Sequence, residues 1–199
     1  LPICLMENSD VSILFSGNID GTTSIHCEKI EVTASGNLST FHLYGDNNRL
    51  ELSGAVGNVV IGKDASKSNN NYLIVKGSVV GNYIICGDGN VISNSGNVGT
   101  MDIKGEKNTF TNEKNAGVGT RFSVQGGSNT IRNFGTIYSL EFTGMDGFVV
   151  NEKDSKIING PAGNGDYAIW IGTPLGNEYI KTSITIHNFG VIEGGGAYV

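Results

Sequence analysis

A glycine, one variable residue and an aliphatic residue recur along this chain at nearly constant spacing. Successive repeat glycines are 19, 18, 23, 19, 21, 18, 25 and 30 residues apart, which is 173 residues over 8 steps, or about 22 per step. A period of this size predicts a chain made of stacked copies of one small unit. The copies are Gly17-Asn18-Ile19, Gly36-Asn37-Leu38, Gly54-Ala55-Val56, Gly77-Ser78-Val79, Gly96-Asn97-Val98, Gly135-Thr136-Ile137 and Gly190-Val191-Ile192, with Gly117 and Gly160 as weaker members.

Two further patterns lie between these glycines. Apolar residues alternate with others before a glycine, as in Phe122-Ser123-Val124-Gln125-Gly126, which is typical of a strand with one buried face. An aliphatic residue, a spacer and an asparagine follow, as in Ile131-Arg132-Asn133. Each repeat thus resembles one coil of three short strands. We expect an all-β fold, a right-handed parallel β-helix (β-solenoid) of about nine coils of roughly 19–22 residues, with an N-terminal cap.

The composition agrees with strands and turns. Glycine accounts for 30 residues and asparagine for 23, while Ile and Val together number 37 against 17 for Leu and Ala. Glycine and asparagine disfavour helix interiors, and β-branched residues favour strands. The net charge of −6, without a cluster of Lys or Arg, argues against nucleic acid as a partner.

The repeat also suggests how the chain is divided. We expect residues 1–16 to form the N-terminal cap and residues 17–199 to form the β-helix. Coils are lengthened near 62–71 and near 160–181. Insertions in a solenoid project from one face, which is often the binding face.

Four asparagines recur in phase with the repeat. Asn94, Asn112, Asn133 and Asn151 are 18, 21 and 18 residues apart. Stacked asparagines can pair their side-chain amides from coil to coil, so we expect a structural asparagine ladder. The alternative is that each is simply a turn residue, since asparagine tolerates left-handed backbone conformations.

The cysteines and histidines allow several interpretations. Cys4 and Cys27 enclose the expected first coil, where a disulfide would pin the cap; two buried thiols are the alternative. Cys86 follows three apolar residues and is expected to be a buried small hydrophobe. His26 and His42, 16 residues apart, could align on adjacent coils, but no further ligands recur to complete a metal site. We therefore expect no metal and exposed histidines.

An aromatic group in the second long coil is the best candidate for binding. Tyr167, Trp170 and Tyr179 lie in the segment 160–181, where exposed rings could stack on sugars or anchor a protein partner. Strand alternation leaves two possibilities: either Ala168 and Trp170 point inward, or Tyr167 and its alternates do.

No catalytic pattern is evident. Polysaccharide lyases and hydrolases need paired carboxylates or an acidic calcium site, but Asp88, Asp102 and Glu106 are isolated in the sequence. We expect no catalytic residues and no cofactor. An enzyme acting on polysaccharides and a purely structural stalk remain alternatives to a binding protein.

Several segments resemble the passenger region of bacterial autotransporters and related hemagglutinin-like secreted β-helices. They are VISNSGNVG (91–99), NTIRNFGTI (129–137), AIWIGTPLG (168–176) and ITIHNFGVIEGGG (184–196). The resemblance implies a β-helix displayed on the surface of a Gram-negative cell, acting in adhesion or cell–cell aggregation. Its partner would be a host-cell protein or glycan receptor, or a second copy.

The resemblance also implies how such a chain would be attached to the cell. Passengers of this family contact the membrane through a C-terminal translocator barrel, which this sequence lacks. The chain stops in the middle of its pattern, so we expect it to be a fragment of a longer passenger.

Overall fold

The computed structural model describes residues 2–4, 11–63, 67–160, 167–172, 182–194 and 197–198, with backbone only at 2–4 and 197–198. In these ranges every regular element is a β-strand, and neighbouring strands are parallel. None of the described residues belongs to a helix that is long and apolar enough to cross a membrane.

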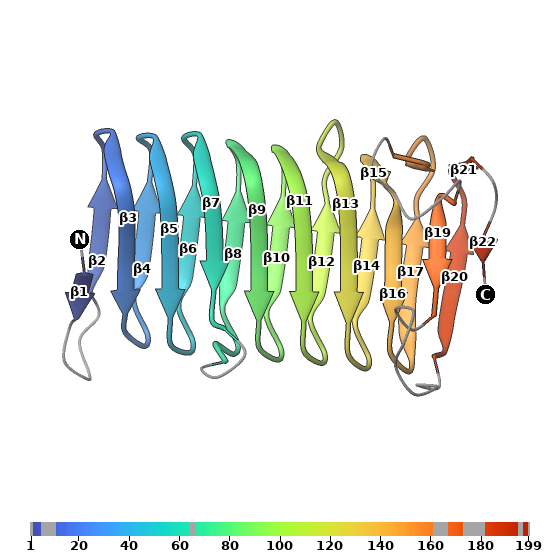
Figure 1. Ribbon diagram of the computed structural model, residues 1–199, viewed down its shortest axis with the longest axis horizontal. Coiled ribbons are helices and arrows are strands. Elements are labelled where there is room, and N and C mark those ends of the chain that lie inside the picture. The colour runs from blue at the N-terminus through green and yellow to red at the C-terminus, as the bar shows by residue number, and fades with distance from the viewer. Residues whose placement is uncertain are drawn as a thin grey trace.

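Two parallel sheets enclose a single core (Figure 1). Sheet A contains Pro2–Cys4 (β1), Ile19–His26 (β3), Leu38–Tyr44 (β5), Val56–Ile61 (β7), Ser78–Cys86 (β9), Asn97–Lys104 (β11), Gly117–Gln125 (β13), Thr136–Tyr138 (β15), Leu140–Thr143 (β16), Lys156–Ile158 (β18), Ile169–Ile171 (β19), Val191–Glu193 (β21) and Ala197–Tyr198 (β22). Sheet B contains Ser12–Phe15 (β2), Glu31–Ala34 (β4), Arg49–Leu52 (β6), Tyr72–Val75 (β8), Val91–Asn94 (β10), Thr109–Asn112 (β12), Thr130–Asn133 (β14), Gly147–Asn151 (β17) and Ile184–Asn188 (β20).

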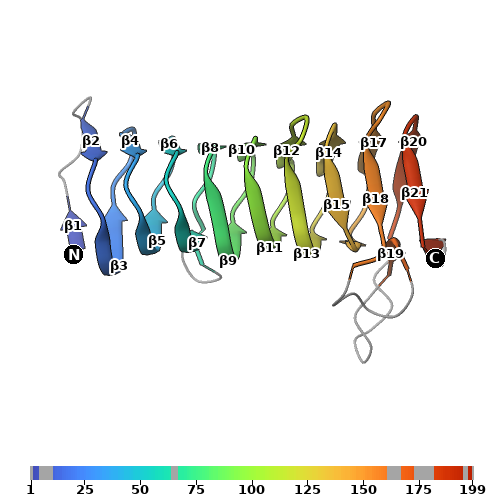
Figure 2. The same ribbon diagram turned by 90° about the horizontal axis from the view of Figure 1, so that it is seen from above.

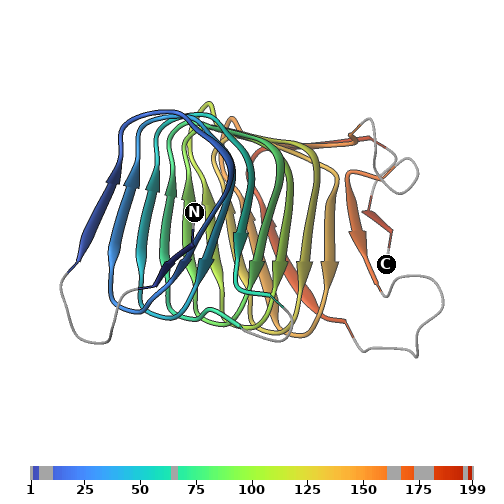
Figure 3. The same cartoon turned by 60° about the vertical axis from the view of Figure 1, so that its left-hand side comes forward.

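The chain winds around one long axis. It alternates between sheet B on one side and sheet A on the other (Figure 2). Viewed from its N-terminal end, the chain rises along sheet B, crosses over and descends along sheet A as it recedes (Figure 3). The coil is therefore right-handed, with about eight turns. This confirms the parallel β-helix expected from the repeat.

Each coil uses its three expected strands in a different way from that suggested by the sequence. The short strand after the repeat glycine is the first part of a longer sheet A strand. A register shift separates the two parts, as between Val98 and Thr100 in β11. In a later coil the parts become separate strands, β15 and β16, on either side of Ser139, which has a positive φ of 49°.

Columns of apolar side chains fill the interior, because the pleat of each strand directs alternate residues inward. The register places one column along each sheet, with its members buried or half-buried. The sheet B column is Ile13, Val32, Leu50, Leu73, Ile92, Phe110, Ile131, Val149 and Ile186, and the sheet A column includes Phe41, Val59, Tyr83, Met101, Phe122, Leu140 and Ile169.

The ranges expected to leave the coil retain much of its regularity. Strand β2 lies within the range 1–16 but pairs in register with β4. In the segment 62–71, the backbone N–H of Asn70 donates to Asp88, so this part has rejoined the stack. Strand β19 lies within 160–181 and pairs with β16. Residues 64–66, 161–166 and 173–181 lie outside the described residues.

The repeat glycines stack so closely that a side chain has no room. A Cβ on Gly96 would overlap the carbonyl oxygen of Gly77 in the preceding coil, and a Cβ on Gly54 would overlap that of Gly36. Gly17 occupies the same place in its repeat but has nothing within 4 Å of its Cβ position. The glycine is therefore required by the neighbouring coil.

We expect Gly96→Ala to lower the free energy of unfolding by about 1–3 kcal/mol, because the two coils must move apart. Gly17→Ala is the matched control and should change it by less than about 1 kcal/mol. Chemical denaturation of both variants tests this. Equal losses would contradict close contact between the coils as the reason for the glycine.

Candidate functional site

Trp170 points outward from sheet A. Its neighbours Ile169 and Ile171 are buried in the core, while Trp170 itself is half-buried. This resolves the alternation that the sequence left open in strand β19. Tyr167 is also half-buried, and Tyr179 lies outside the described residues. Of the three aromatic candidates, Trp170 is the one whose ring the strand geometry directs away from the core.

A charged cluster adjoins Trp170 on the same face. Trp170 is the register partner of Glu141, which continues an outward row through Ser123 to Asp102. Arg121 bridges this row: its Nη2 lies 3.0 Å from Asp102 Oδ1, and its Nε lies 3.6 Å from Glu141 Oε2. Asp102 is isolated in the sequence, but the coil brings it near a second carboxylate.

Glu141 is an unusual carboxylate. Only 9% of the residue is exposed, and its Oε1 atom has no hydrogen-bond partner. Burial raises the pKa of Glu141, Arg121 opposes that rise, and the charge of Asp102 adds to it. A buried acceptor without a donor is unfavourable. A ligand that donates a hydrogen bond beside the Trp170 ring would satisfy it.

The predicted asparagines form a continuous ladder inside the core. Each donates from Nδ2 to the Oδ1 of the next, at 2.9, 2.9, 2.8 and 2.8 Å, along Asn94, Asn112, Asn133, Asn151 and Asn188. In the earlier coils the same inward position holds Phe15, Ala34, Leu52 and Val75. The first four of these asparagines are fully buried, so the ladder supports the structure rather than offering a surface to a ligand.

A second asparagine ladder was not foreseen. It consists of buried residues one position before the sheet B strands, where each backbone N–H donates to the next side-chain Oδ1 at 2.8–2.9 Å. Their spacing of 23, 19, 18 and 21 residues follows the repeat and could have revealed them. The members are Asn48, Asn71, Asn90, Asn108 and Asn129.

The cysteine predictions are only partly accessible. Cys27 and Cys86 are both buried. The backbone of Cys4 pairs with His26, the residue before Cys27, but the Cys4 side chain lies outside the described residues. The Cys4–Cys27 disulfide stays a prediction.

The histidines do not align as a pair. The register sets His26 beside Tyr44, with ring centroids 4.6 Å apart, and sets His42 beside Ser24. Burial, Lys63 and His26 lower the pKa of His42. Across the described ranges, no three His, Cys, Asp or Glu side chains gather as metal ligands would.

We expect Glu141 to make stability depend on pH. Because the folded state raises its pKa, its contribution is present at low pH and is lost as pH rises from about 4 to about 7. Glu141→Gln should lose less unfolding free energy than the wild type over this interval. Denaturant unfolding at several pH values measures it, with the exposed Glu106→Gln as control. Identical pH profiles for Glu141→Gln and wild type would contradict the assignment.

Comparison with protein-family models, with curated proteins and with solved structures finds no match to this chain.

Proposed function

We propose that this chain is a non-enzymatic, surface-displayed β-helical segment of a Gram-negative autotransporter passenger, which acts in adhesion to host cells or in cell–cell aggregation. Its ligand would be a glycan or protein on the opposing cell, bound at the outward face around Trp170. The autotransporter assignment rests on the sequence resemblance, and the binding role rests on the geometry of this face.

The observation that carries the proposal is the position of Trp170. Its ring projects from a regular sheet, next to a buried carboxylate oxygen without a donor and the guanidinium of Arg121. An aromatic ring flanked by hydrogen-bonding groups suits a sugar ring or an interface anchor. The hydrogen-bonded stack beneath holds these groups in fixed rows.

We expect the chain to bind a glycan array or cultured host cells, and Trp170→Ala to weaken that binding by about thirtyfold, the effect of losing a central aromatic anchor. Val80→Ala is the control, since Val80 is 74% exposed on sheet A and should leave binding unchanged. If the wild-type chain binds no glycan and no cell, the adhesive role of this segment is wrong.

One observation favours a second candidate function, polysaccharide cleavage. Asp102 and Glu141 contact the same guanidinium, so their carboxylates lie within about 10 Å, a separation that glycosidases use. However, Arg121 lies between them, where a sugar or attacking water would have to be. Release of new reducing ends from polysaccharides by the wild type, lost in Glu141→Gln, would favour cleavage over adhesion.

A further inference from the structure

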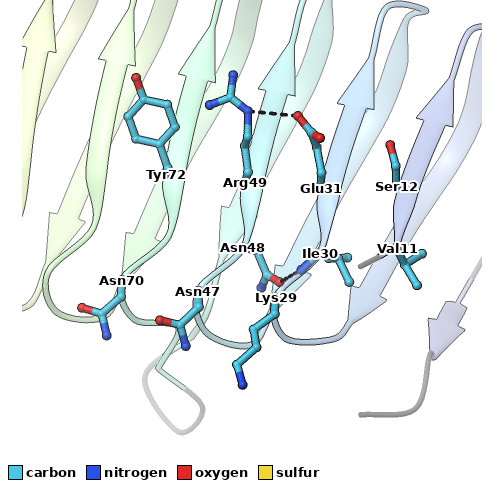
Figure 4. A pocket seen from close by; sticks show the side chains of 10 residues that line it. All are labelled: Val11, Ser12, Lys29, Ile30, Glu31, Asn47, Asn48, Arg49, Asn70 and Tyr72. Carbon is cyan, nitrogen blue, oxygen red and sulfur yellow. Dashed lines mark hydrogen bonds and ion pairs between the residues drawn. The ribbon is translucent and has the colours of Figure 1, made fainter. Parts of the chain in front are cut away.

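A depression of about 420 Å³ lies on sheet B near the N-terminal end (Figure 4). One side is the outward row Glu31, Arg49 and Tyr72, which are register partners on successive coils. The other side is the corner residues Lys29, Asn47 and Asn70, which have left-handed backbones with φ of 55°, 61° and 55°. The volume falls within the range of small-ligand sites.

The depression exists because the residues between these two rows turn into the core. Ile30, Asn48 and Asn71 are 4%, 2% and 1% exposed. The side chains on both sides therefore stand above a low floor. Beyond Tyr72 the outward row continues with Val91 and Thr109, whose shorter side chains leave a lower wall.

The backbone of the floor has its hydrogen bonds satisfied within the protein. The N–H of Ile30 donates to Asn48 Oδ1, and the N–H of Asn48 donates to Asn71 Oδ1. The N–H of Tyr72 donates to the Asn48 carbonyl. An extended peptide that adds to a sheet needs a free strand edge, which this floor lacks. A ligand here must be recognised by side chains.

The walls offer those side chains. The Arg49 guanidinium lies 3.0 Å from Glu31 and 5.1 Å above the Tyr72 ring, and 41% of Tyr72 is exposed. The amides of Asn47 and Asn70 make no hydrogen bond to any described residue, and they lie at the corner beside the depression (Figure 4). One aromatic surface is thus surrounded by donors and acceptors of both kinds.

We propose that this depression binds a linear oligosaccharide that lies along the rod and crosses successive coils. A sugar ring packs on Tyr72, and its hydroxyl groups bond to Glu31, Arg49 and the amides of Asn47 and Asn70. Hydroxyl groups donate and accept, so they suit a wall of mixed carboxylate, guanidinium and amide groups.

This site goes beyond the function proposed above. It lies on the other sheet from Trp170 and holds whether or not Trp170 binds a ligand. The chain's net charge of −6 disfavours nucleic acid as the occupant. The carboxylate of Glu31 within the wall disfavours a strongly acidic peptide.

The test measures binding of the full chain to a panel of linear oligosaccharides of four to six hexose units, both neutral and containing uronic acid. We expect Tyr72→Ala to weaken the affinity for the bound members by about tenfold or more. Tyr72→Phe keeps the ring and should retain most of the affinity. Val91→Ala is the matched control, since Val91 is equally exposed at 41% and adjoins Tyr72 in the row.

Thermal unfolding of each variant separates lost binding from lost folding. The proposal is overturned if no oligosaccharide binds, if Tyr72→Ala binds like the wild type, or if Val91→Ala weakens binding equally. It is also overturned if an extended acidic peptide binds in a Tyr72-dependent manner and the sugars do not. Binding that depends on Trp170 and not on Tyr72 would place the sugar at the other face.

Discussion

The register between successive coils is the constraint on which the structure depends. Each strand bonds to its equivalent in the coils before and after it, so the same side-chain position recurs in a straight row. Corners such as Gly96 have no Cβ because the preceding carbonyl occupies that space. The surface rows of Trp170 and of Tyr72 follow from the same register. A shift in register would separate each ring from its polar neighbours.

Asparagine at an inward position makes that register specific. Hydrophobic side chains such as Leu52 and Val75 can pack beside many neighbours, whereas a buried amide is satisfied only by another polar group at the right height. Beginning with Asn94, the aliphatic column of the early coils changes to amides. The ladder thus favours one alignment of the later coils and penalises others.

The sequence predicted the features that recur in phase, and missed those that need the register to be known. The spacing of Asn94 to Asn151 indicated a ladder directly. The residues of the second ladder, such as Asn48 and Asn90, resemble turn residues because each comes just before a strand. Arg121 and Glu141 are 20 residues apart, which means contact only once each coil's length is fixed. The direction of Trp170 followed from pairing with Glu141, which alternation alone could not decide.

The most direct test of this account is hydrogen exchange of side-chain amides, followed by NMR. The buried amides of Asn112 and Asn133 each donate to the next asparagine, while Asn37 lies exposed at a corner. We predict that the Nδ2 protons of Asn112 and Asn133 exchange as slowly as the core backbone amides, and those of Asn37 within the dead time. Equally fast exchange at all three sites would contradict a register held by buried asparagines.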